Sequence, residues 1–161
     1  MSFAQPSLKG RALRLLSGRE YSRAELERKL KTHEETPGEL VRALDELQAK
    51  GFISEQRVVE SVINRRSAKL GTARIRQELQ GKGLDPQAVT DAVASLKATE
   101  LSRAREVWRK KFGAKSDDAP GGAVTDAAER GKQMRFLAAR GFGGDVIRRV
   151  VSGAGDDALD E

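Results

Sequence analysis

Hydrophobic residues recur at spacings of three and four along most of the chain, which predicts amphipathic α-helices. No segment of useful length alternates with a period of two, so we expect no β-sheet. The apolar positions form nine groups, which predict nine helices. Their markers are Leu8, Ala12, Leu15 and Leu16; Leu26 and Leu30; Leu40, Val41, Leu44 and Leu47; Val58, Val59, Val62, Ile63 and Leu70; Ile75 and Leu79; Val89, Val93 and Leu96; Leu101, Ala104, Val107, Trp108 and Phe112; Met134 and Leu137; and Val146, Ile147, Val150 and Val151.

A short pattern that occurs three times predicts where helices end. The chain reads LQAKGF at 47–52, LQGKGL at 79–84 and LAARGF at 137–142. A basic side chain in the last turn can interact with the exposed carbonyl groups, and the glycine can adopt the left-handed conformation. The apolar residue that follows is expected to pack back onto the last turn. We therefore predict three helices with similar ends, at Gly51, Gly83 and Gly141.

Capping residues predict where several helices begin. The sequence SRAE at 22–25 is a capping box, and Tyr21 before it can act as a hydrophobic staple. TPGE at 36–39 predicts a second box, with Pro37 in the first helical position. The pair Asp85 and Pro86 follows the same logic. Weaker caps are expected at Thr72 and Thr99.

The nine predicted helices divide into three groups of three. We therefore predict an all-α fold of three tandem three-helix repeats that form an elongated, curved array, with repeats at 1–53, 54–98 and 99–153. Residues 113–125 are rich in glycine, alanine and aspartate, which predicts a flexible loop in the third repeat. Residues 154–161 are acidic, and we expect them to form a disordered tail.

Composition and charge limit the possible functions. The 161 residues include 30 Lys and Arg against 24 Asp and Glu, a net charge of +6 that favours nucleic acid or an acidic protein surface as partner. The chain has no Cys, which excludes disulfides and thiolate metal sites. It also has no apolar stretch of signal-peptide or membrane-spanning length, so we expect a soluble cytoplasmic protein.

The sequence offers no catalytic or cofactor site. A single histidine, His33, leaves no histidine-based metal site or catalytic triad, and we expect it to be exposed at a helix end. GAKS at 113–116 and GFGGD at 141–145 lack the spacing of nucleotide-binding loops. Trp108 lies on an apolar face, so core packing is a better reading than base stacking. We expect no enzymatic activity, no metal and no cofactor.

Lys and Arg residues gather in three places. Five of them surround the tight corner near Gly71, where Arg66 falls within the apolar stripe and needs a partner such as Glu78. A second cluster precedes residue 116, and a third follows residue 131. Any single Lys or Arg is most simply explained as part of a solvent-exposed helix face. Three clusters of them favour a surface that binds a partner.

Several segments closely resemble the RecX regulatory proteins of bacteria. They are RALRLLSGREYSRAELERKL (11–30), GTARIRQELQGKGL (71–84) and RFLAARGF (135–142), with KGFISEQRVVESVINRRSAK (50–69) and VWRKKFG (107–113) fitting the connecting segments. The resemblance covers roughly residues 8–152. Two departures concern the corner: the chain is one residue shorter before Gly71, and Leu70 stands where an aromatic residue is common.

The resemblance implies a function. Such proteins are helical, are not enzymes, and bind the RecA recombinase as its filament on single-stranded DNA. They lodge in the filament groove, inhibit ATP hydrolysis and strand exchange, and limit filament growth. We therefore expect a negative regulator of RecA in homologous recombination, DNA repair and the SOS response. Its partner is the RecA filament, with single-stranded DNA contacted weakly or through the filament, and we expect no membrane partner and a monomeric state.

The basic clusters and the family motif together give the expected filament- or DNA-binding residues. These are Arg65, Arg66, Lys69, Arg74, Arg76, Lys82, Lys110, Lys111, Arg135, Arg140, Arg148 and Arg149. Two alternatives remain open at this point. Residues 54–84 could act as a helix-turn-helix that binds DNA without RecA, or the chain could be a purely structural scaffold, which leaves the charge clusters unexplained.

Overall fold

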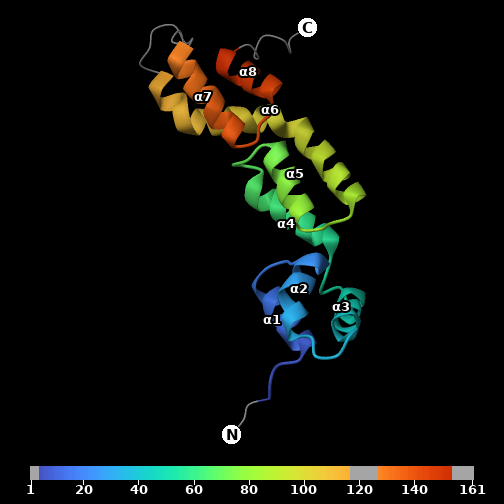
Figure 1. The fold of residues 1–161 in the computed structure, drawn as a ribbon. Helices are drawn as coiled ribbons and strands as arrows, with labels where there is room; N and C mark the ends of the chain where they lie inside the picture. The colour runs from blue at the N-terminus through green and yellow to red at the C-terminus, as the bar shows by residue number, and fades with distance from the viewer. Residues whose placement is uncertain (1–3, 117–126, 154–161) are drawn as a thin grey trace. The chain divides into compact units, whose positions relative to one another are not determined.

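The computed structural model describes residues 4–116 and 127–153, and those residues form helices and connecting turns without any β-strand. Figure 1 shows the helices in chain order. They are α1 (Leu8–Gly18), α2 (Arg23–Leu30), the 3₁₀ helix η1 (Lys31–His33), α3 (Glu39–Ala49), α4 (Glu55–Arg66), α5 (Thr72–Gly81), α6 (Pro86–Ser116), α7 (Ala127–Ala139) and α8 (Gly144–Ser152). The all-helical prediction is confirmed for this part of the chain, within which no helix is long and apolar enough to cross a membrane.

The count of nine helices is wrong, because the predicted sixth and seventh helices are one. α6 runs for 31 residues without a break at Thr99. Thr99 lies in the middle of that helix, where its hydroxyl donates to the carbonyl of Leu96 at 3.3 Å instead of capping a new start. The first four residues of the predicted loop 113–125 also belong to α6, whereas residues 117–125 and the predicted tail lie outside the described residues.

The chain divides into two compact units, each with its own core. Unit 1 comprises the described residues 4–61 and 79–89. Unit 2 comprises the described residues 62–78, 90–116 and 127–153.

One core cluster of unit 1 comes from α1, α2, α3 and the segment after α3. Its buried residues are Leu8, Ala12, Tyr21, Leu26, Leu30, Leu40, Leu44, Leu47 and Ile53. Val41, predicted to share the apolar stripe of α3, is instead 51% exposed. It lies one residue beyond Leu40, which is about 100° around the helix from the buried stripe.

The predicted cap at Ser22 forms, but the Glu25 carboxylate of the predicted box pairs with Lys82 and Arg19. The Ser22 hydroxyl oxygen accepts a hydrogen bond from the Glu25 N–H at 3.2 Å, and Tyr21 lies in the same core as Leu26, as a staple requires. The box predicted at Thr36 is wrong. α3 starts only after Gly38, which has φ of 86°, and the N–H of Leu40 donates to the carboxylate of Glu34 at 2.9 Å.

The three predicted glycine stops are confirmed. Gly51, Gly83 and Gly141 have φ of 82°, 66° and 88°. Leu84 and Phe142, which follow two of them, are buried, but Phe52 is 46% exposed. The N–H of Phe52 still donates to the Leu47 carbonyl at 2.9 Å, so the stop forms while Ile53 takes the core position expected for Phe52.

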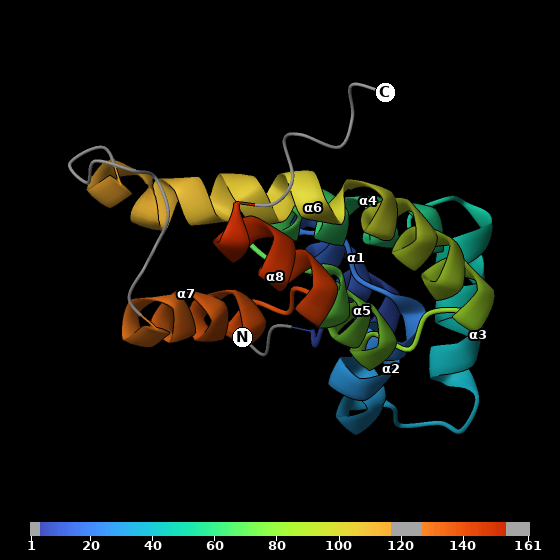
Figure 2. The same ribbon diagram turned by 90° about the horizontal axis from the view of Figure 1, so that it is seen from above.

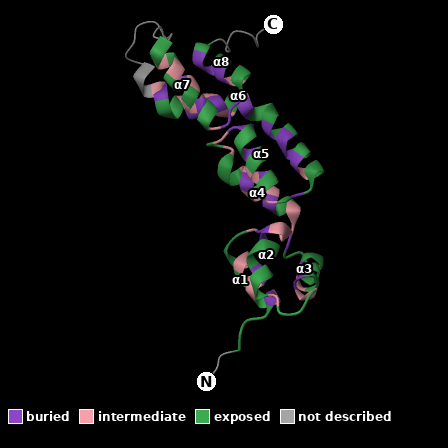
Figure 3. Cartoon of the chain, in the orientation of Figure 1, coloured by how far each residue is buried: buried purple, intermediate pink, exposed green. Residues whose placement is uncertain are grey.

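One core cluster of unit 2 lies where α7 and α8 pack against the C-terminal part of α6 (Figure 2). Its buried residues are Ala104, Val107, Leu137, Phe142, Ile147, Val150 and Val151. The buried positions of α8 follow one side of the helix (Figure 3). Trp108 packs against this core, as expected, and is partly buried. Its indole N–H donates to the buried Gln133 side-chain oxygen at 2.8 Å, which holds one edge of the ring at a polar position.

This hydrogen bond makes a stability prediction. Trp108→Phe should lower the free energy of unfolding by about 1–2 kcal/mol, because the buried oxygen of Gln133 loses its donor. A second change, Gln133→Met, should recover part of that loss, because the unpaired oxygen is then gone. Urea denaturation of the two single variants and the double variant measures both effects. An unchanged stability of Trp108→Phe would show that the hydrogen bond contributes nothing.

Candidate functional site

The positive charge of the chain is concentrated in unit 2. Its described residues include eighteen Lys and Arg against six Asp and Glu, a net charge of +12. Unit 1 has twelve against eleven, a net charge of +1. Unit 2 therefore carries most of the excess charge that favours an acidic partner.

The N-terminus of α5 docks onto the turn between α7 and α8. The N–H of Gly71 donates to the Arg140 carbonyl at 2.7 Å, and the N–H of Ala73 donates to the Gly141 carbonyl at 3.2 Å. Between them, the N–H of Thr72 donates to the buried carboxylate of Glu100 on α6 at 3.1 Å. The first N–H groups of a helix have no partner within it, so these acceptors complete the start of α5. We call this arrangement the α5 joint.

Two glycines make the close approach at the α5 joint possible. A Cβ atom on Gly71 would overlap the backbone carbonyl of Gly141. A Cβ atom on Gly141 would overlap the Arg74 side chain and lie 2.7 Å from the Arg74 nitrogen. Only glycine therefore lets α5 and the α7–α8 turn touch along their backbones.

Arg103 on α6 ties the end of α4 to the α5 joint. Its guanidinium donates to the carbonyls of Ser67 at 3.0 Å, Leu70 at 2.6 Å and Leu96 at 3.0 Å, and to the Thr72 hydroxyl at 3.2 Å. Burial lowers the pKa of Arg103, and the nearby charge of Glu100 opposes that shift. This cation therefore holds the corner together rather than facing a partner.

The joint brings Arg74 and Arg140 together. The Arg74 guanidinium lies across the α7–α8 turn and donates to the Ala139 carbonyl at 3.3 Å. The Arg140 guanidinium lies 4.8 Å from the ring centroid of Phe136. One of these predicted site residues comes from the corner cluster and the other from the third cluster, so backbone docking joins two clusters that are far apart in sequence.

The remaining cations of the corner differ in whether they are paired with a carboxylate. Arg66 forms an ion pair with Glu78 at 3.3 Å, as expected, but its side chain is 44% exposed and does not lie in the apolar stripe. Arg65, Lys69 and Arg76 are exposed and have no ion pair with any described residue. These three, with Arg74 and Arg140, are called the joint cations.

The other predicted site residues lie farther along unit 2 or outside it. Lys111 lies 5.7 Å from the Phe136 ring centroid, and Arg148 pairs with Asp145 on the surface of α8. Lys110, Arg135 and Arg149 are exposed on α6, α7 and α8 respectively. Lys82 belongs to unit 1, whereas the joint cations belong to unit 2.

Lys82 takes part in a buried ion pair. Its ammonium lies 2.9 Å from a Glu25 oxygen, and the second Glu25 oxygen lies 2.7 Å from Arg19. Burial raises the pKa of Glu25, but the hydrogen bonds from Lys82 and Arg19 outweigh it and leave that pKa lowered. The Lys82 side chain is 13% exposed, which suits a structural cation better than a binding one.

Sequence reasoning missed Glu100 and Arg103. A signal was present, because Glu100 falls on the same helical stripe as the buried residues Leu96, Ala104 and Val107. A carboxylate at such a position needs a buried partner. The sequence alone does not reveal that this partner is the backbone of Thr72.

The close packing at the α5 joint predicts the effect of one methyl group. Gly71→Ala should lower the free energy of unfolding by at least about 2 kcal/mol, because the new Cβ separates α5 from the turn or strains both. Gly81→Ala at the other end of α5 is the matched control, since a Cβ there meets no atom within 4 Å. It should leave stability unchanged or raise it by up to about 1 kcal/mol. Thermal denaturation measures both, and equal melting temperatures for the two variants would contradict the joint.

Comparison with known proteins places the chain in a family. Residues 9–47, 54–93 and 98–151 match the families described as the first, second and third three-helix domains of RecX. The chain is 52% identical over 147 residues to the regulatory protein RecX of Leptothrix cholodnii, covering 91% of this chain and 88% of that one. It is 44% identical over 155 residues to that of Ralstonia nicotianae, covering 96% and 92%.

Solved structures agree with the fold. The crystal structure of RecX from Lactobacillus salivarius matches with a TM-score of 0.71 at 20% identity, covering 89% of this chain and 92% of that one. This likeness shows the helical fold, and the three matched domains show its three-helix organisation. The sequence relatives carry the family assignment: the chain belongs to the RecX family of regulatory proteins, which are not enzymes.

Proposed function

We propose that this protein is a negative regulator of RecA that binds in the groove of the RecA filament on single-stranded DNA. Binding there inhibits ATP hydrolysis and strand exchange and limits filament growth. The proposal is supported by membership in the RecX family and by the charge of unit 2. It acts as a monomer without a cofactor, and it contacts single-stranded DNA weakly or through the filament.

The joint cations are the observation that carries the proposal. Arg65, Lys69 and Arg76 have no ion pair among the described residues, so their charge is available to a partner. Arg74 and Arg140 are held in place by the α5 joint, which reduces the ordering that binding would require. A filament presents DNA phosphates and repeated protein surfaces, so several modest charged contacts can add to tight binding.

A helix-turn-helix that binds duplex DNA directly is the second candidate. It is favoured by the tight corner between α4 and α5 and by the cations around it. In that class the N-terminal residues of the second helix reach the bases. Gly71 and Thr72 are buried, and the first turn of α5 is used by the α5 joint, so the helix start is not free for bases. The structure therefore favours the filament over the duplex.

The test reverses two joint cations that make no structural contact. Lys69→Glu with Arg76→Glu should raise the concentration needed to inhibit the DNA-dependent ATPase of RecA by about tenfold. Two surface contacts of about 0.7 kcal/mol each account for that factor. Inhibition should also weaken as salt rises. The matched control is Lys31→Glu with Arg42→Glu, which makes the same charge change at exposed positions of unit 1.

Three results would count against the proposal. Equal inhibition by the folded Lys69→Glu, Arg76→Glu variant and the control would remove the joint cations from the binding surface. Inhibition that does not change over a wide salt range would exclude an electrostatic mechanism. Tight, sequence-selective binding to duplex DNA without RecA would support the helix-turn-helix instead.

A further inference from the structure

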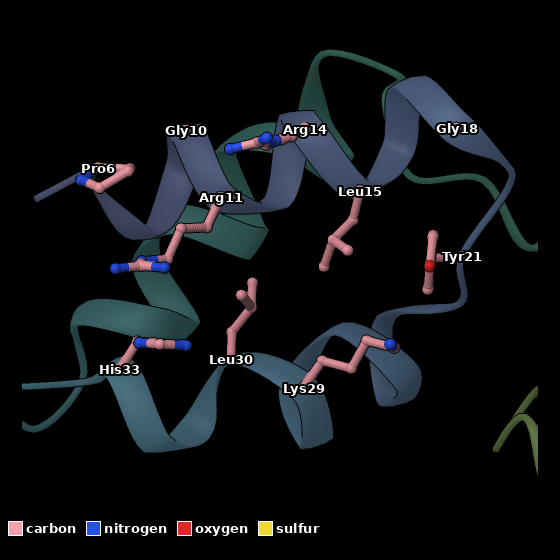
Figure 4. Close-up of a pocket in the computed structure, with 10 residues that line it drawn as sticks. All are labelled: Pro6, Gly10, Arg11, Arg14, Leu15, Gly18, Tyr21, Lys29, Leu30 and His33. Carbon is pink, nitrogen blue, oxygen red and sulfur yellow. The ribbon is translucent and has the colours of Figure 1, made fainter.

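Unit 1 contains a groove of about 550 Å³ between α1 and the segment formed by α2 and η1. In Figure 4, Leu15 and Leu30 point from these two elements into the space between them. Arg11, Arg14 and Lys29 also line the groove, and none of its lining residues is acidic. The groove therefore combines an aliphatic floor with a cationic rim.

The cations of this groove differ from most others in unit 1. Arg11 donates to the neutral side chain of Gln5 at 3.0 Å, and Lys29 lies 5.8 Å from the Tyr21 ring centroid. Neither of them, nor Arg14, has an ion pair with any described residue. By contrast, six cations of the unit are paired with carboxylates: Lys9 and Lys50 with Glu46, Arg19 and Lys82 with Glu25, Arg23 with Glu27 and Asp45, and Arg57 with Glu20.

The strength of the pairing elsewhere sharpens this contrast. Glu46 accepts hydrogen bonds from Lys9 and Lys50, which lower its pKa to about 2. Unit 1 is nearly neutral, so carboxylates are available in number to balance its cations. The groove is nevertheless without one. Three like charges around one hollow repel each other unless an anion is placed between them.

The apolar side chains of the groove indicate which other chemical group the anionic ligand contains. Leu15 is partly buried, so an aliphatic group placed against it would be partly removed from water, whereas Leu30 is 3% exposed and belongs to the core beneath the groove. A single nucleic-acid strand would instead need an exposed aromatic face on which to stack its bases. The aromatic residue of the groove, Tyr21, is 8% exposed, and the Arg19 guanidinium lies 3.6 Å from its ring centroid.

We propose that this groove binds a short acidic peptide segment of a partner protein. An aliphatic side chain of the segment lies against Leu15, and carboxylates on either side of it pair with Arg11, Arg14 and Lys29. This surface shares no residue with the joint cations. It gives the protein a second contact, one that recognises a peptide rather than phosphates.

Fluorescence anisotropy with the full-length chain tests the proposal. The probe is a fluorescein-labelled synthetic peptide of sequence DEDLDED, and the comparison peptide has Ser in place of Leu. The Leu peptide should bind at least tenfold more tightly than the Ser peptide. Arg14→Glu with Lys29→Glu should weaken binding of the Leu peptide at least tenfold. The control Lys31→Glu with Arg42→Glu, which changes two exposed cations outside the groove, should change it less than twofold.

A milder pair, Arg14→Gln with Lys29→Gln, gives the same answer if charge reversal unfolds unit 1, and circular dichroism checks the fold of each variant. Equal binding by the wild type and the folded groove variants would overturn the proposal. So would equal affinity for the Leu and Ser peptides. Displacement of the peptide by oligothymidylate, with loss of oligothymidylate binding in the groove variants, would make the groove a nucleic-acid site. No RecA is present, so these outcomes are independent of the function proposed above.

Discussion

The first turn of α5 is the constraint on which the arrangement of unit 2 depends. A helix start presents N–H groups with no partner inside the helix, and each one buried unpaired costs about 1–3 kcal/mol. At Gly71, Thr72 and Ala73 those groups are satisfied by two carbonyls of the α7–α8 turn and by Glu100. Because one turn of helix needs acceptors from two other elements, α5, α6 and the α7–α8 turn must fold together.

The α5 joint holds together a unit whose positive charges repel one another. Unit 2 carries a net charge of +12 in its described residues, and such an excess destabilises a compact state by self-repulsion. The backbone hydrogen bonds of the joint, and those that Arg103 donates to the carbonyls of Ser67 and Leu70 after α4, hold the cations close despite this repulsion. An anionic partner that binds the folded form relieves this repulsion, so binding and folding stabilise each other. Unit 1 is nearly neutral, and six of its cations are paired with carboxylates, whereas the three cations of the groove are not.

The parts of the fold that depend on near neighbours could be predicted from sequence. The glycine stops, the Ser22 cap and the Arg66–Glu78 pair follow from caps and tight turns. Thr99 misled because a threonine inside a helix looks like a cap until the residues before it are known to be helical. The candidate site could be predicted only as clusters of charge. The contacts that decide which cations are unpaired join residues far apart in sequence. Lys82 pairs with Glu25, 57 residues away, and the N–H of Thr72 at the corner donates to Glu100, 28 residues away.

Native-state amide hydrogen exchange at Gly71, Thr72 and Ala73 tests the α5 joint most directly. These amides precede or begin a helix, where exchange is fast unless an acceptor outside the helix protects them. If the α5 joint holds unit 2 together, all three should exchange only with global opening of the unit, at the same free energy as the amide of the buried core residue Leu137. Exchange at rates typical of a frayed helix end, while Leu137 stays protected, would show that α5 is not docked and would contradict the joint.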